Sequence, residues 1–157
     1  SEQNAVWSYP LTGADAEQTA FNMVNAMTMR IHQSGHLAKL SGENKELIRE
    51  GIAYYKSYRE LIKISFPFWP LGMPAFDHKQ FALGFRNEVC AHLAVWNIES
   101  ANGGMEIPLD GLEREISHIE LVYPASLPCE YRYYRETGKL VVRQPEKSAR
   151  LFKIDCK

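Results

Sequence analysis

Long apolar runs are missing from this 157-residue sequence, and so is an excess of charge of either sign. No apolar stretch approaches the roughly 20 residues that a helix needs to span a bilayer. Residues 1–4 are polar, where a secretory signal would be basic and then apolar. The formal net charge is -1, and both signs are mixed along the chain without a basic stripe that would hold phosphates. We therefore expect neither a membrane nor a nucleic acid among its partners.

Cysteine is scarce as well. Cys90, Cys129 and Cys156 are widely spaced and odd in number, which argues against a disulfide scaffold and favours a reducing compartment. A bridge between Cys129 and Cys156 stays open, because pairing cannot be read from a sequence. We expect a cytoplasmic protein. The first residue of a fragment would carry no targeting information, so this expectation rests on the cysteines alone.

The chain does contain enough apolar material for a folded core. Hydrophobic residues make up 45% and charged residues 24%, close to the average of soluble globular domains. Asp15 is a candidate N-cap for a helix over 16–33, in which apolar residues recur every three or four positions and which Gly35 would end. Ser41 is a second N-cap candidate, for a helix that runs to about Ile64 with one apolar face and one face rich in Lys and Glu.

Two short segments around these helices lack a clear period. Residues 6–13 contain aromatics, a proline and a glycine, and they are predicted to form a loop. Residues 36–40 form a short apolar link between the two helices. Two long helices in succession, with almost no strand pattern beside them, are expected to need another surface to pack on.

The sequence changes character at Pro67. Residues 66–74 combine three prolines with three large aromatics, which rules out a continuing helix and predicts an extended, packed connector. From Phe81 onward the apolar period becomes two, and turn signals separate the short runs. The predicted strands lie at 81–85, 89–95, 107–109, 116–122, 129–133, 140–142 and 149–154. About seven short strands with tight turns predict an antiparallel β-sandwich, so the fold class is α+β.

No group of residues stands out as catalytic. His32 and His36 have the i, i+4 spacing of metal ligands on one helical face, but Gly35 is expected to break the helix between them and no third ligand is evident. Ser34 lacks the elbow motif of serine hydrolases, and no glycine-rich loop leads into a helix that could hold phosphate. The carboxylates occur at helix caps, on solvent-exposed helix faces and in turns, where acidic residues are common for structural reasons. No metal, cofactor or carboxylate pair for acid–base chemistry is predicted.

Aromatic side chains are the remaining candidates for ligand contact, since their rings can stack on sugars. Trp96 ends an alternating strand and is predicted to be core, whereas Trp69 lies among prolines and is predicted to cover the interface of helices and sheet. Trp7 lies in a predicted loop, where function more often resides. Residues 131–135 alternate Tyr with Arg, which could stack single-stranded bases, but a two-faced antiparallel strand gives the same pattern and is favoured.

Six segments in a fixed order carry a resemblance to a known family. They are Val6-Trp7-Ser8-Tyr9-Pro10-Leu11, Phe21-Asn22-Met23-Val24-Asn25-Ala26-Met27, Arg30-Ile31-His32-Gln33-Ser34-Gly35-His36-Leu37, Tyr54-Tyr55-Lys56-Ser57-Tyr58-Arg59, Pro67-Phe68-Trp69-Pro70-Leu71-Gly72 and Leu93-Ala94-Val95-Trp96. Together they resemble the α-galactosidases of glycoside hydrolase family 36 over about residues 3–98. The later strands agree with that family only in pattern.

This resemblance implies that the chain is a carboxy-terminal portion of a larger enzyme. Residues 1–65 would be the terminal helical elements of a (β/α)8 barrel, residues 66–79 a connector, and residues 80–157 a carboxy-terminal antiparallel β-sandwich. The link at 36–40 would be the last barrel strand. The loop at Trp7 would lie at the carboxyl face of the barrel, where active sites form.

The resemblance also implies an activity, the retaining hydrolysis of terminal α-galactosides without a cofactor. The family's two catalytic aspartates lie on earlier barrel strands and no position here matches them, so no catalytic residue is assigned and the chain alone is expected to be inactive. Trp7, Tyr9 and His36 are predicted to line the rim of the sugar pocket. The expected partners are a galactoside or oligosaccharide, through the complete enzyme, and the rest of the barrel or a second copy, which would cover an otherwise exposed helical face.

The alternative is a free-standing carbohydrate-binding or interaction module. In such a module the apolar faces of the helices would be buried against the sandwich. In a barrel fragment they would be exposed or would meet another chain.

Overall fold

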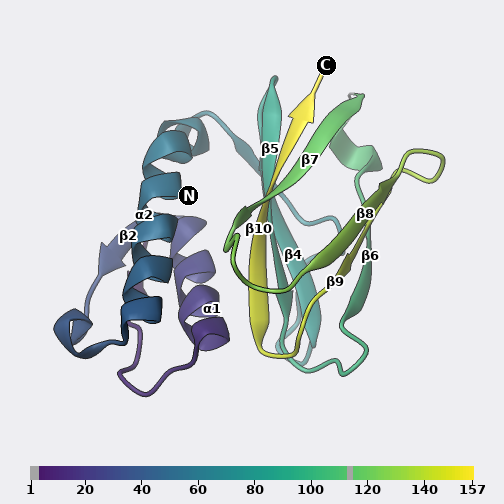
Figure 1. Cartoon of the computed structure of the whole chain (residues 1–157). Coiled ribbons are helices and arrows are strands. Elements are labelled where there is room, and N and C mark those ends of the chain that lie inside the picture. Colours follow the sequence, from purple (N-terminus) through teal and green to yellow (C-terminus); the bar gives the residue numbers. More distant parts are fainter. Residues whose placement is uncertain (1–3, 113–114) are drawn as a thin grey trace.

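The computed structural model describes residues 4–112 and 115–157; the first three residues of the expected 1–65 unit lie outside the described ranges. The elements are β1 (Ala5–Ser8), α1 (Ala16–Met27), β2 (Arg30–Gln33), the 3-10 helix η1 (Leu37–Lys39), α2 (Gly42–Lys63), β3 (Phe66–Phe68), β4 (Gln80–Arg86), β5 (Cys90–Asn97), β6 (Gly104–Pro108), the 3-10 helix η2 (Asp110–Leu112), β7 (Ile116–Tyr123), β8 (Glu130–Tyr134), β9 (Lys139–Arg143) and β10 (Ser148–Cys156). Within these ranges the strands form a parallel pair β1-β2, a five-stranded sheet β3-β4-β5-β10-β7 and a three-stranded sheet β6-β9-β8. Figure 1 shows the helices on one side of the five-stranded sheet and the three-stranded sheet on the other.

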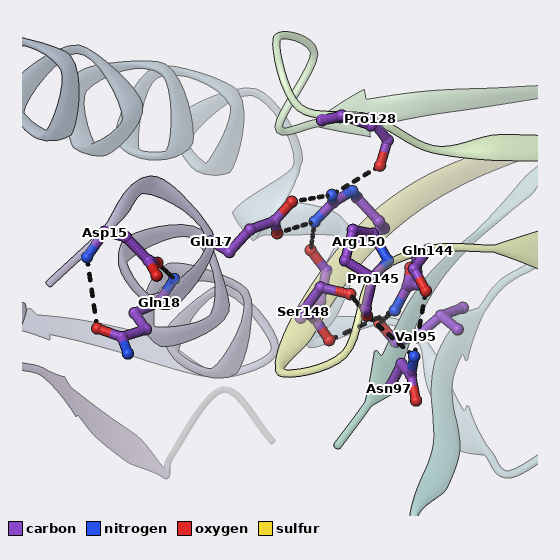
Figure 2. Close-up of polar contacts among 11 residues, drawn as sticks. Asp15, Glu17, Gln18, Val95, Asn97, Pro128, Gln144, Pro145, Ser148 and Arg150 are labelled. Atoms are coloured by element: carbon purple, nitrogen blue, oxygen red, sulfur yellow. Dashed lines mark hydrogen bonds and ion pairs between the residues drawn. The ribbon is translucent and has the colours of Figure 1, made fainter. Parts of the chain in front are cut away.

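Both predicted helix starts are confirmed. The Asp15 side chain accepts a hydrogen bond from the backbone N–H of Gln18 at 2.8 Å, and the Gln18 side chain accepts one from the Asp15 N–H at 3.4 Å, which forms a capping box (Figure 2). Ser41 Oγ accepts from the Asn44 N–H at 3.1 Å at the start of α2. Each cap satisfies a backbone donor that a helix leaves without an internal partner.

The predicted end of the first helix is wrong. The helix stops at Met27, where the Thr28 hydroxyl donates to the Asn25 carbonyl at 2.8 Å, and the chain then turns into β2. Ile31 continues the apolar period of the helix, but residues 30–33 gain backbone hydrogen bonds by pairing with β1. Tertiary pairing has overridden the local helical pattern, which is a weak constraint by itself.

The predicted loop at 6–13 and the predicted barrel strand at 36–40 also need correction. Residues 5–8 are strand β1, which pairs in parallel with β2, so α1 is the crossover of a β1-α1-β2 unit. Residues 37–39 form a 3-10 helix, and the strand of this region lies earlier, at β2. A four-residue strand spans only two alternations, too few to be recognised against a neighbouring helical period.

The helices pack on the five-stranded sheet. Buried side chains from α1, α2, β5, β7 and β10 form one apolar cluster, in which the Trp96 indole N–H donates to Asn25 Oδ1 at 2.7 Å. Gly51 allows α2 to approach α1 closely, because a Cβ at position 51 would lie only 3.0 Å from Met23 Cε. The expectation that a helical face is left uncovered is therefore wrong. In Figure 1 β2 lies at the outer side of the helices, away from that sheet.

The predicted strands are confirmed, and so is the α+β class. A second buried cluster fills the space between the five-stranded and three-stranded sheets and draws on β4 to β7, β9 and β10. The connector is extended at Phe66–Phe68, as predicted, and it pairs with β4 as an edge strand, where Pro67 is tolerated because one side of an edge needs no N–H. The division at 66–79 into separate units stays a prediction.

Two further expectations concern cysteines and membranes. Cys129 is a free thiol, so the bridge to Cys156 is not formed. None of the helices in the described ranges is long and apolar enough to cross a bilayer.

Candidate functional site

The parallel pair has one covered face and one open face. Ser8 is buried against α1, and Val6 and Ile31 are half-buried, whereas Trp7 and His32 are exposed. Trp7 pairs with His32 in the strand register, so the two side chains emerge on the same face. The Trp7 side chain is 67% exposed. Parallel strands in proteins are normally covered on both faces, so this open face is unusual for a finished fold.

The carboxyl ends of the two strands are held together by hydrogen bonds that are partly shielded from solvent. The Ser8 carbonyl accepts from the Ser34 backbone N–H at 2.9 Å and from Gln33 Nε2 at 3.1 Å. The Ser8 hydroxyl, which is fully buried, donates to Asn22 Oδ1 of α1 at 2.9 Å. The loops that follow β1 and β2 therefore start from a fixed edge.

The two loops touch through Tyr9 and Gly35. Gly35 has φ +92, in the left-handed region that favours glycine, and a Cβ built there would lie 3.4 Å from Tyr9 Cε1. The loop after β2 consequently passes against the Tyr9 ring, which stays 44% exposed. Gly35 serves this turn and does not end a helix.

The three predicted rim residues occupy different parts of this site. Tyr9 and His36 lie on the loops at the carboxyl end, and His36 is exposed at the start of η1 without a side-chain capping bond. Trp7 lies inside β1 on the open face, and its strand partner is His32. Sequence reasoning missed His32 and Arg30 as members of this face, because it placed both within a helix. The only signal was the alternation of polar and half-buried residues over β2.

Few groups among the described residues could bind a metal ion or act as a nucleophile. No group of three or more His, Cys, Asp or Glu residues between 4 and 112 or between 115 and 157 could hold a metal ion. Burial raises the pKa of Cys90 and raises that of Cys129 to about 11, so neither thiol is a ready thiolate at neutral pH. Glu17 and Glu106 are engaged in ion pairs with Arg150 and Lys139. These groups have structural partners.

Comparison with known proteins gives a likeness of fold. No protein-family model and no curated protein matches the sequence. The galactosidase domain of the α-galactosidase-sucrose kinase AgaSK matches 98% of this chain with 18% identity and a TM-score of 0.69, over 22% of its own length. The family 36 α-galactosidase AgaB from Geobacillus stearothermophilus matches 98% with 19% identity and a TM-score of 0.64, over 22% of its length.

A third match is a variant of the family 36 α-galactosidase AgaA from Geobacillus stearothermophilus in complex with raffinose. It covers 87% of this chain and 19% of its own length, with 16% identity and a TM-score of 0.57. The chain thus spans about a fifth of the length of the enzymes it matches. Its fold fits a carboxy-terminal portion of the glycoside hydrolase family 36 α-galactosidases.

Proposed function

We propose that this chain is the carboxy-terminal portion of a retaining α-galactosidase, in which β1, α1, β2 and α2 complete a (β/α)8 barrel. The open face of the parallel pair carries this proposal. Strand, helix, strand and helix follow one another, the strands are parallel, and α1 covers only one of their faces. A barrel supplies what the pair lacks, since its strands turn one face to the helices and the other to a packed interior.

The proposed position of the substrate follows from strand direction. Active sites of such barrels form at the carboxyl ends of the strands, and here that end carries the Tyr9 and His36 loops. Trp7 is one residue before the end of β1 and presents an exposed ring suited to stacking on a sugar. We place these three residues at the rim of a pocket for terminal α-galactosides of the raffinose type, the ligand of the AgaA variant.

The chemistry itself is assigned to other parts of the proposed enzyme. Retention of configuration needs two carboxyl groups roughly 5 to 5.5 Å apart on either side of the glycosidic bond. The residues of this site supply aromatic rings, imidazoles and backbone carbonyls instead. The isolated chain is therefore expected not to turn over galactosides.

A carbohydrate-binding or interaction module is the second candidate, and one observation favours it. The apolar faces of α1 and α2 are buried against each other and against the five-stranded sheet, as expected of a self-contained unit. The open face of the parallel pair argues against a self-contained module, because parallel strands are normally covered on both faces.

Turnover of p-nitrophenyl α-galactoside separates the two candidates. The isolated chain should show none, and the same chain joined to the remainder of its parent enzyme should be active. In that active enzyme, Trp7→Ala should lower kcat/KM by about tenfold if the ring stacks on the sugar. Phe76→Ala is the matched control, since Phe76 is a fully exposed aromatic outside the parallel pair.

Each alternative outcome has a definite meaning. Turnover by the isolated chain would place catalytic groups within it and overturn the assignment. Equal effects of Trp7→Ala and Phe76→Ala would remove Trp7 from the rim. Saturable sugar binding without any turnover, in the isolated and the joined chain alike, would establish the module.

A further inference from the structure

A hollow of about 450 Å³ lies between the second half of α2 and the five-stranded sheet, apart from the parallel pair. Its helix side includes Tyr54 and Tyr58, and its sheet side includes His92, Glu120 and Lys153. The volume lies within the range of sites that take small molecules. Neither the proposed barrel nor the raffinose-type pocket uses these residues.

The three polar groups of the sheet side form one row. Lys153 of β10 pairs with His92 of β5 on one side and with Glu120 of β7 on the other. Partners in register point to the same face of a sheet, so an imidazole, an ammonium and a carboxylate stand side by side facing α2.

The imidazole is held in place by the helix. Tyr58 stacks on His92 with ring centroids 4.3 Å apart and planes inclined by 17°, and the Tyr58 hydroxyl donates to the Met27 carbonyl at 2.6 Å. The Tyr54 hydroxyl lies 3.0 Å from His92 Nε2. Burial, followed by the nearby Glu120 carboxylate, raises the pKa of Tyr54, so its hydroxyl stays protonated. One wall of the hollow is therefore a fixed assembly of rings with a hydroxyl at its edge.

The charged groups on the sheet side of the hollow keep hydrogen-bonding capacity for a ligand. Lys153 Nζ lies 2.8 Å from Asp155 Oδ1, yet the Lys153 side chain stays 36% exposed, and an ammonium has three donors. Glu120 is exposed, and an ionised carboxylate has about four acceptor positions. Donors and acceptors of opposite charge are thus both available to a ligand in the same hollow.

We propose that this hollow binds a neutral polyhydroxylated ligand, a saccharide unit, as a site separate from the end of the parallel pair. An anionic ligand would meet Glu120 and Asp155, and a cationic ligand would meet Lys153. A neutral polyol avoids both conflicts, because each hydroxyl can accept from the ammonium and donate to the carboxylate. The apolar part of the Tyr54 ring offers a surface for the C–H side of a sugar.

The test is a titration of the folded protein with galactose and with raffinose, followed by amide chemical shifts in NMR. We expect saturable shifts in β7, β10 and the second half of α2. Glu120→Gln and Lys153→Met should each raise Kd by about tenfold or more, since each removes hydrogen bonds to a charged group. Both side chains are partly or wholly exposed, so both variants should fold, which circular dichroism checks.

The matched control is Phe76→Ala, at an exposed aromatic outside both this hollow and the parallel pair, which should leave these shifts and this Kd unchanged. The proposal is overturned if neither sugar gives saturable shifts, or if Kd responds to Trp7→Ala but not to Glu120→Gln and Lys153→Met. Tighter binding of galacturonate or glucosamine than of galactose would contradict a neutral ligand. None of these results depends on the galactoside turnover that tests the proposed function.

Discussion

Arg150 and Glu17 form a two-pronged ion pair that joins the helical layer to the sandwich. Arg150 Nη1 and Nη2 lie 2.8 and 2.7 Å from the two Glu17 carboxylate oxygens, and Nη2 also donates to the Pro128 carbonyl at 2.8 Å (Figure 2). Arg150 lies on β10 and is fully buried, whereas Glu17 lies in the first turn of α1 and keeps a side-chain exposure of 23%. The ion pair therefore links α1, near the start of the described chain, to β10, near its end, across the interface between the helices and the five-stranded sheet.

Removal of Glu17 should be costly, because it leaves the guanidinium charge of Arg150 buried without its carboxylate. We expect Glu17→Gln to lower the free energy of unfolding by roughly 3 kcal/mol, the scale for breaking a buried pair from one side. Urea denaturation measures the change. Glu106→Gln is the matched control, since Glu106 pairs with Lys139 at 2.8 Å on the exposed surface and should matter little. Equal losses in the two variants would contradict a special role for the buried pair.

His92 should make the stability fall in mild acid. Burial, and next the nearby Lys153, lower the pKa of His92 to about 4, while in the unfolded chain it is near 6.5. Above pH 6.5 the imidazole is neutral in both the folded and the unfolded state, and its contribution to the free energy of unfolding is fully present. Between pH 6.5 and 4 the unfolded chain takes up a proton that the folded protein does not, so stability decreases as the pH falls. At 1.36 kcal/mol per pKa unit the loss is on the order of 3 kcal/mol.

Unfolding free energies measured at intervals from pH 7 to pH 4 test this dependence. His92→Phe keeps a ring against Tyr58 but cannot titrate, so its stability should change less over this window. The groups around His92 are Tyr54, Tyr58, Lys153, the Asp155 carboxylate, which opposes the lowering of its pKa, and, through the same row, Glu120. An unchanged pH profile in His92→Phe would assign the dependence to other groups, such as the carboxylates.

The sandwich could be predicted from the sequence, whereas the parallel pair could not. Strands β4 and β5 are long, their apolar residues recur at every second position, and a tight turn joins them, so the local pattern and the final pairing agree. The N-caps Asp15 and Ser41 were also readable, because a cap depends on a side chain and the backbone a few residues away.

The parallel pair depends on partners that are distant along the chain. β1 and β2 have four residues each and are separated by a whole helix, and their pairing is invisible until α1 has folded back between them. The candidate site was affected for the same reason. Trp7 is predicted to contact a ligand because it lies in a predicted loop, but its neighbour His32 is predicted to lie in a helix, since the register that brings them together is a tertiary feature.

Gly84 should be intolerant of a side chain. A Cβ at Gly84 would lie 2.1 to 2.8 Å from the Phe68 ring, which crosses over β4 from the edge strand β3. Gly84→Ala should therefore destabilise the protein by about 1 to 3 kcal/mol and weaken hydrogen-exchange protection in β3. Gly111→Ala is the control, since nothing lies within 4 Å of its Cβ position. In the Phe68→Ala background the cost of Gly84→Ala should shrink. A cost that is the same in both backgrounds would rule out this contact as the cause.

The open face of the parallel pair should make the isolated chain self-associate. Trp7 is 67% exposed on strands that have unpaired edges, and nearby Leu11 is 63% exposed. Sedimentation velocity over a range of concentrations should show association that Trp7→Lys reduces, because a charge on this face opposes burial against a second copy. Phe76→Lys adds the same charge at another exposed aromatic and should leave the association unchanged. If both variants behave alike, the association arises from general surface hydrophobicity. If the chain stays monomeric at every concentration, the parallel pair does not need a cover, and the argument for a barrel loses its main support.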